Sequence, residues 1–290
     1  MNSRRDVLGM GTGVLGSATM AALAGCSELP VVDTHTDESL DYREWTFDPE
    51  TLDEPNITVL AIDIETLLAG DDPHDEDVFR ELLEGTFHDE LEADDVESFV
   101  SIAPIEILAG SFDADDVFEA LDASSEDGHE EFDIAFDEDG ETMFASDGTF
   151  LVAMPGIAAP DDASRELLEL AIDTYNGDEA RFVDTSDDFA RITDEIEAGT
   201  HTTITGYAES SLEDEPDSSP VADASVASVD GEEAHVDLAV LYADEEYADN
   251  ERLESEIHAE QSGDEFEVED SDVDGRLVRL EYAMAAEDYL

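Results

Sequence analysis

Hydrophobic and polar positions from residue 56 onward follow the periods of strands and helices in turn. Alternating apolar and polar residues predict a half-buried strand, and apolar residues three or four positions apart predict a helix. The expected strands lie at 57–63, 98–103, 131–137, 141–145, 149–154, 202–208, 224–229, 234–242, 265–269 and 277–284. The expected helices lie at 77–83, 113–121, 161–175, 187–196 and 245–260. Because Asp-Gly turns between short strands indicate hairpins, we expect an α+β fold with antiparallel sheets.

The order of these elements predicts two modules, each an antiparallel sheet with helices packed on one face. The first module spans 56–197 and the second spans 198–290. Within the first module, segment 64–70 resembles segment 105–110, and Asp77-Val78-Phe79 recurs 39 residues later as Asp116-Val117-Phe118. Two copies predict a local duplication, since a solenoid needs about three or more repeats.

The residues that precede the first module, 27–55, are polar and acidic. Such a segment is expected to act as a tether for the modules. Three aromatic residues lie near its end, Tyr42, Trp45 and Phe47. We expect these rings to pack on the edge of the first module.

The charge balance identifies the solvent in which such a chain can fold. The 290 residues contain 83 Asp and Glu against 10 basic residues, all of them arginine, which gives a net charge of -73. At about 0.1 M salt these charges repel one another over about 10 Å, whereas at about 1 M salt the screening length falls to about 3 Å. With 41% hydrophobic residues the chain can still build a core, so we expect a folded protein adapted to concentrated salt. Nucleic acid is excluded as a partner, because the surface has the same sign as the phosphate backbone.

The first 26 residues carry an export signal. Arg4 and Arg5 precede an apolar, glycine-containing stretch at 7–24, and Leu23-Ala24-Gly25-Cys26 follows. This order resembles the twin-arginine signal and lipobox of haloarchaeal lipoproteins, although Val7 stands where Phe is usual. The resemblance implies export, attachment of lipid to Cys26 and anchoring to the outer face of the cell membrane. The alternatives are an uncleaved membrane helix, for which 18 residues with four glycines are short, and cleavage that leaves Cys26 as a free thiol.

One segment near the C-terminus matches the calcium-binding loop of EF-hands. Asp270, Asp272 and Asp274 occupy loop positions 1, 3 and 5, Gly275 occupies position 6 and Glu281 occupies position 12. Calcium is therefore the one candidate cofactor. The flanking residues alternate as strands do, which favours a hairpin turn at Asp274-Gly275 instead.

Other chemical motifs are few. The seven histidines are scattered, and no two lie at the i, i+4 spacing of a zinc-binding helix. The sequence contains no G-x-S-x-G motif and no P-loop, and its glycine run at 9–16 belongs to the export signal. Paired carboxylates are too numerous to single out a catalytic pair. Asn56-Ile57-Thr58 is an N-glycosylation sequon at the entry to a predicted strand.

Segment 145–207 resembles, in the order of its strands and helices, secreted or membrane-anchored proteins of unknown function. We expect a cell-surface lipoprotein of a halophile that is a non-enzymatic binding or structural module of the envelope. Two alternatives remain open at this point: a solute- or metal-binding accessory protein, and a carboxylate-dependent hydrolase. The hydrolase would require acidic residues with raised pKa values that converge in a concavity.

Overall fold

The computed structural model describes most of the chain beyond residue 39. The described residues are 40–52, 54–68, 86–87, 91, 95–125, 128–137, 142–155, 162–196, 199–212, 218–230, 233–260 and 267–285. The expected helix at 77–83 and the residues of the export signal lie outside them.

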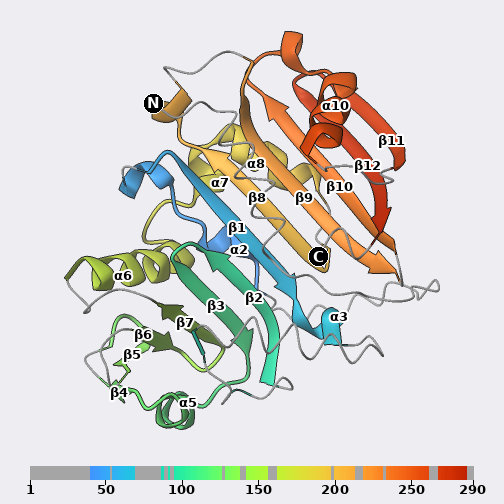
Figure 1. The fold of residues 1–290 in the computed structure, drawn as a ribbon. Helices are drawn as coiled ribbons and strands as arrows, with labels where there is room; N and C mark the ends of the chain where they lie inside the picture. Colours follow the sequence, from blue (N-terminus) through green and yellow to red (C-terminus); the bar gives the residue numbers. More distant parts are fainter. Residues whose placement is uncertain are drawn as a thin grey trace.

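The described strands form one antiparallel sheet of twelve strands (Figure 1). Their bounds are β1 Asn56–Asp63, β2 Val96–Ile102, β3 Ile105–Gly110, β4 Ser124–Ser125, β5 Asp133–Phe136, β6 Met143–Ser146, β7 Phe150–Met154, β8 His201–Tyr207, β9 Pro220–Asp230, β10 Glu233–Tyr242, β11 Glu267–Asp274 and β12 Leu277–Ala285. Their order in the sheet is β11-β12-β10-β9-β8-β1-β2-β3-β7-β6-β5-β4. The sheet therefore extends without a break from β4, at the lower left of Figure 1, to β11 at the upper right.

Helices lie on both faces of this sheet. Their bounds are α2 Tyr42–Trp45, α3 Ile64–Leu68, α5 Ala114–Ala120, α6 Asp162–Asn176, α7 Phe182–Thr185, α8 Asp187–Glu195, α9 Glu209–Leu212 and α10 Asn250–Glu260, with single 3₁₀ turns at Pro49–Leu52 and Glu245–Tyr247. Residues of α2, α6, α7 and α8 pack into one hydrophobic cluster, and residues of α3, α5 and α10 pack into another. Because alternate residues of each strand point to opposite faces, the two clusters lie on opposite sides of the sheet. We call these sides the α6 face and the α10 face.

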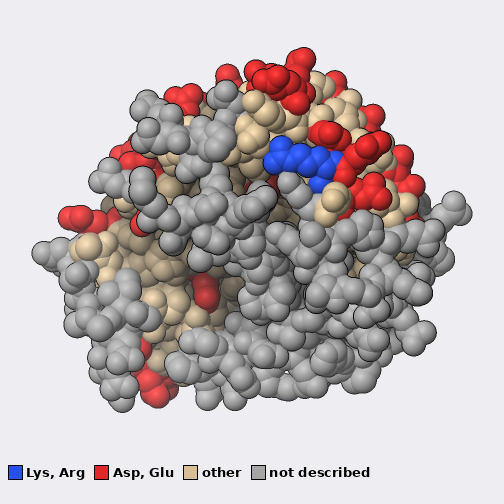
Figure 2. Space-filling model, turned by 45° about the horizontal axis from the view of Figure 1, so that its top comes forward, with Lys and Arg blue, Asp and Glu red and all other residues tan. Residues whose placement is uncertain are grey.

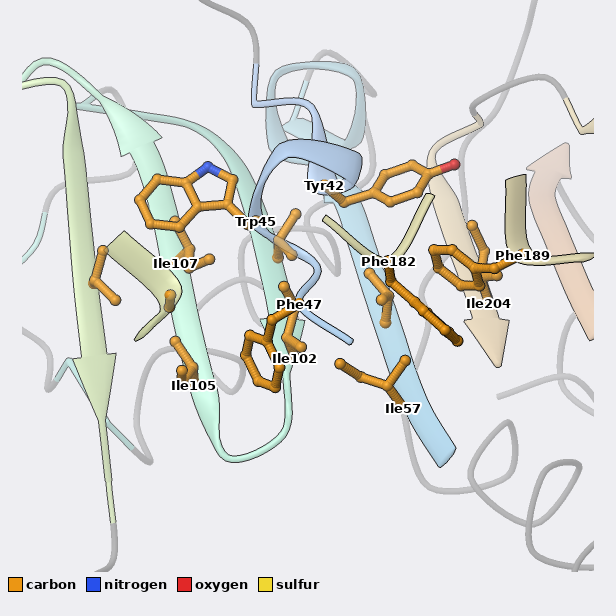
Figure 3. Close-up of a cluster of buried hydrophobic side chains, with 14 of the residues drawn as sticks. Tyr42, Trp45, Phe47, Ile57, Ile102, Ile105, Ile107, Phe182, Phe189 and Ile204 are labelled. Carbon is orange, nitrogen blue, oxygen red and sulfur yellow. The ribbon is translucent and has the colours of Figure 1, made fainter. Parts of the chain in front are cut away.

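Aromatic side chains hold the helices of the α6 face to the sheet. Trp45 is fully buried and stacks on Tyr175 of α6, with ring centroids 4.4 Å apart. Phe182 of α7 and Phe189 of α8 stack on each other at 4.5 Å and lie near Ile204 of β8 (Figure 3). Each such ring buries about 150–250 Å² of surface, so these contacts make a large contribution to the stability of this face.

Local signals in the sequence set several of the element boundaries. Asp113 caps α5 by accepting from the backbone N–H of Asp116, and Ser186 caps α8 by accepting from that of Phe189. The helix α6 ends before Gly177, whose φ of +79° suits glycine. The hairpin of β11 and β12 turns at Gly275, with a φ of +61°.

The prediction of an α+β fold with antiparallel pairing is confirmed, but the division into two modules is not. The strand β8 follows the expected boundary at 197/198, yet it pairs with β1 on one side and β9 on the other. The expectation of helices on one face is also wrong, since both faces are covered. Spacing along the chain predicts which segments form strands, but it carries no information on the pairing that joins the halves.

Three local expectations also differ from the structure. Segment 64–68 is the helix α3 whereas the similar segment 105–110 is the strand β3, so these two copies do not share a structure. The expected helix at 245–260 is a 3₁₀ turn followed by α10. Residues 40–52 of the expected tether belong to the folded body, with Trp45 and Phe47 in the core and not at its edge.

Candidate functional site

The candidate site is a group of polar side chains on the α10 face at the centre of the sheet. It consists of Thr58 on β1, of His201, Thr203, Thr205 and Tyr207 on β8, and of Asp223 and Ser225 on β9. Thr205 pairs with Thr58 on one side and with Asp223 on the other, and Thr203 pairs with Ser225. Residues paired in this way point to the same side of an antiparallel sheet, so these side chains form one continuous surface. We call it the polar strip.

A hydrogen-bonded cluster occupies one end of the polar strip. The hydroxyl oxygens of Thr58 and Thr205 lie 3.3 Å apart, and the Tyr207 hydroxyl donates to Asp223 Oδ1 over 3.5 Å. Thr205 also hydrogen-bonds to the Asp223 carboxyl. Desolvation by the surrounding atoms raises the pKa of Asp223 to about 7, against a smaller lowering by these two hydrogen bonds, although part of the residue still reaches solvent. Near neutral pH the carboxyl is therefore partly protonated and can donate as well as accept.

His201 occupies the other end of the polar strip and is almost fully buried. Its exposure is 2%, and within the described part of the chain neither ring nitrogen has a hydrogen-bond partner. Burial lowers the pKa of His201 to about 4, so the imidazole is neutral at pH 7. A buried polar group without a partner costs about 1–3 kcal/mol. A hydrophobic side chain would avoid this cost, so the presence of a histidine here requires an explanation other than stability.

Glu106 is a second carboxyl with a raised pKa on the same face. Glu106 is the strand-pairing partner of Ser101, which in turn pairs with Leu60. Burial raises the pKa of Glu106, and a hydrogen bond with Thr86 lowers it by a smaller amount. Between Glu106 on β3 and Asp223 on β9 there are four steps in the sheet, or about 19 Å at about 4.8 Å per step. The carboxyl pairs of glycosidases lie within about 9.5 Å of each other. These two groups therefore do not form such a pair, and the hydrolase alternative gains no support from them.

A separate polar cluster joins α6 to the turn before β5. His129 Nε2 lies 2.6 Å from Asp173 Oδ1, and its Nδ1 lies 3.8 Å from Glu169 Oε1, which also accepts from Arg165 Nε over 2.7 Å. These contacts satisfy polar atoms of all four side chains, so we interpret the cluster as a structural link. Among the residues that the structure describes, no group of three or more His, Cys, Asp or Glu side chains is arranged to hold a metal ion.

The residues of the calcium-loop match lie on two paired strands. Asp270, Asp272 and Asp274 are alternate residues of β11, and Glu281 on β12 is the pairing partner of Asp270. Asp272 pairs with Arg279, and β11 and β12 are joined by a turn at Gly275. Extended strands spread the carboxylates along the hairpin, whereas an EF-hand gathers them in a loop between two helices. The residues thus lack the helix–loop–helix context that the calcium hypothesis requires.

The other predicted site residues fall in different places. Asn56 is the first residue of β1 and is half-buried, and the hydroxyl of its sequon partner Thr58 lies in the polar strip. Arg4, Arg5 and Cys26 lie outside the described residues, as do His35, His74 and His88.

The arginines of the folded body serve as internal links. Arg276, in the turn before β12, pairs with Asp188, and Arg279 on β12 pairs with Glu195, so both contacts fasten α8 to the β11–β12 hairpin. Arg191 donates to the Asp274 carbonyl over 3.1 Å, and the Arg181 side chain donates to the Tyr175 carbonyl over 3.0 Å. On the face shown in Figure 2, the small basic area is bordered by acidic residues.

Comparisons with known proteins identify no family for this chain. No family model matches it, and no curated protein matches it. Crystal form III of TP0453 is similar in structure, with a TM-score of 0.47 and 12% identity over 86% of this chain and 96% of that chain. Crystal form I of the same protein has a TM-score of 0.46 and 11% identity over 87% of this chain and 96% of that chain. Crystal form IV has a TM-score of 0.43 and 11% identity over 79% of this chain and 89% of that chain. A likeness at this level assigns neither a family nor a function.

The polar strip was missed from the sequence, although one signal for it exists. Polar residues alternate at 201, 203, 205 and 207 and again at 223 and 225, on strands that are neighbours in the sheet. Thr202 obscures the first alternation, because it adds a polar residue on the opposite face. Only the pairing of β1, β8 and β9 shows that the three sets adjoin.

Proposed function

We propose that this protein is an exported, lipid-anchored and non-enzymatic module of the cell envelope in an organism that lives at high salt. The observation that carries the proposal is that Arg4 and Arg5 are followed, in the same 26 residues, by a lipobox-like sequence that ends at Cys26, the single cysteine of the chain. The net charge of -73 supports the high-salt setting. No helix among the described residues is long and apolar enough to cross a membrane.

The anchor is tested by fractionation of cells that express the full chain. A Cys26→Ser variant is expected to leave the membrane fraction and appear in the medium, because the thiol that carries the lipid is gone. A matched Ser27→Ala variant is expected to stay with the membrane. An Arg4→Lys, Arg5→Lys double variant is expected to remain inside the cell in unprocessed form. Retention of the Cys26→Ser chain in the membrane would contradict the anchor.

The salt requirement is tested by circular dichroism. Dialysis from concentrated KCl to about 0.1 M is expected to abolish the folded spectrum, and return to brine is expected to restore it, because the like charges repel at about 10 Å in dilute salt. A cooperative fold that persists in dilute buffer would count against the high-salt setting and would leave the anchor unaffected.

A further inference from the structure

We propose that the polar strip lines a binding site for a small neutral molecule rich in hydroxyl groups, a sugar or polyol. The inference goes beyond the proposed function and does not depend on the lipid anchor. It rests on the burial of the strip's residues, on its charge and on the hydrogen-bonding groups that it presents.

Burial varies along the strip. Thr58, Thr203, Tyr207 and Asp223 keep partial exposure, whereas Thr205 and Ser225 are buried and His201 is 2% exposed. His201 lies four residues from Thr205, the pairing partner of Asp223, or about 13 Å along the strand at about 3.3 Å per residue. A molecule that entered beside Asp223 and reached His201 would be elongated, which a single ion is not.

The charge of the strip disfavours ionic ligands. Among its seven residues there is no Lys or Arg, and His201 is neutral at pH 7, so an anion would find no counter-charge there. The other described arginines are engaged elsewhere: Arg43 donates to the Thr193 carbonyl, Arg252 lies 5.8 Å from the ring centroid of Tyr242, and the rest make the contacts given above. Asp223 is the single carboxyl of the strip, which is too few for a divalent cation that takes several carboxylate ligands.

The hydrogen-bonding groups of the strip match those of a sugar. Threonine, serine and tyrosine hydroxyls both donate and accept, and a neutral imidazole has one donor and one acceptor. The hydroxyls of a sugar also do both, so each can be satisfied without any net charge. The pKa of His201 at about 4 and that of Asp223 at about 7 fit this match, since the imidazole is then neutral and the carboxyl can hold a proton near pH 7.

His201 is the second, independent sign of a ligand. Both of its ring nitrogens are buried and find no partner among the described residues, and they lie on the same face as the hydroxyl groups. A histidine with a purely structural role would have found a partner, as His129 does with Asp173. A ligand hydroxyl beside His201 would supply the contact that the imidazole lacks.

The test is calorimetry and thermal melting of the full chain in concentrated KCl at constant ionic strength. Glucose, trehalose and glycerol serve as neutral probes, with glucuronate and glycine betaine as charged comparators. We expect saturable binding of at least one neutral probe and a rise in melting temperature that follows its occupancy. Absence of saturable binding for all three neutral probes, or tighter binding of either comparator, would overturn the proposal.

Variants of His201 separate binding from the general stabilisation that sugars give to any protein. His201→Leu is expected to weaken binding at least tenfold, and His201→Gln, which keeps a donor and an acceptor, is expected to recover part of the loss. His235→Leu on β10, an imidazole that is partly exposed beside Glu269, is the matched control and is expected to bind normally. Ser225→Ala provides a mild second variant, with a few-fold loss expected. Unchanged affinity in both His201→Leu and Ser225→Ala would overturn the proposal.

Discussion

The two faces of the strands β1, β8 and β9 differ in chemistry although alternate residues of the same three strands form them. On the α6 face the strands present apolar side chains such as Ile57, Val59 and Ile204, which the rings of α7 and α8 cover. On the α10 face the same strands present hydroxyls, a carboxyl and a buried imidazole beside the apolar Leu60, Ile62 and Ala227. A face that serves only to fold gains most from hydrophobic burial, so the polar face indicates a requirement other than stability.

The largest expected effect is the loss of the aromatic packing on the α6 face. Trp45→Ala removes a fully buried ring that contacts Tyr175, Phe150 and Phe132. We expect the free energy of unfolding to fall by about 3–5 kcal/mol, as for other buried aromatic truncations. Denaturant titration in concentrated KCl measures it, with Leu52→Ala, at the partly buried margin of the same cluster, as the control. A loss below about 1 kcal/mol would show that this face does not dominate stability.

The polar face is expected to give two opposite dependences of stability on pH. Burial lowers the pKa of His201 from 6.5 to about 4, so in that window the unfolded chain binds a proton that the folded chain does not. The contribution of His201 to the free energy of unfolding is therefore complete above pH 6.5. It falls by on the order of 3 kcal/mol as the pH drops from 6.5 to about 4. Desolvation raises the pKa of Asp223 from 3.8 to about 7, so its contribution is complete below pH 3.8 and falls as the pH rises to about 7.

Single variants separate these two effects. Relative to the wild type, His201→Leu is expected to gain stability as the pH is lowered from 6.5 to 4. Asp223→Asn is expected to gain stability, relative to the wild type, as the pH is raised from 3.8 to 7. Chemical unfolding at a series of pH values measures both slopes. If the free energy of unfolding changes with pH in the same way in the wild type and in both variants, neither His201 nor Asp223 is desolvated as the structure indicates.

A smaller loss of stability is expected at Gly206, where the α6 face of β8 packs closely against two aromatic rings. A Cβ added at Gly206 would lie 2.5 Å from ring atoms of both Phe182 and Phe189. Gly206→Ala is therefore expected to cost about 1–3 kcal/mol, because the rings must move. Thr205→Ser, at the next position but on the polar face, is the control and is expected to cost less. An equal loss in both variants would remove the difference in packing between the two faces.

The smallest effect is expected at the arginine that fastens α8 over the α6 face. Arg276 pairs with Asp188 and also donates to the Tyr242 carbonyl over 3.3 Å, and both side chains of the ion pair are partly exposed. Arg276→Gln is expected to cost about 1 kcal/mol, read as a fall in melting temperature of a few degrees. Arg165→Gln, which breaks the i,i+4 pair with Glu169, is the control with a loss of about 0.3–0.5 kcal/mol.

Much of the secondary structure could be predicted from residue spacing, because helices and strands follow from local periodicity. The strand at 57–63, the helix capped by Asp113 and the turn at Gly275 are of this kind. The short strand β3 was missed, since its residues Ile105–Gly110 resemble a segment that forms a helix elsewhere in the same chain. Tertiary context decided between the two structures.

The pairing of the halves and the polar strip could not be predicted in the same way. Both depend on which strands become neighbours, and β1 and β8 are separated by more than a hundred residues. The burial of Trp45 was underestimated because the residues around it are acidic, and composition alone suggested a tether. The export signal rests on consecutive residues, and it stays a prediction from the sequence.

The most direct test of the difference between the two faces is made on one variant, His201→Leu, at pH 7 in concentrated KCl. Its free energy of unfolding and its affinity for the neutral sugars are measured on the same preparation. If the polar face is kept for binding, the variant will be as stable as the wild type or more stable, since an unpartnered buried imidazole is gone, and saturable sugar binding will be lost. A variant that loses several kcal/mol of stability and still binds sugar as the wild type does would contradict the account.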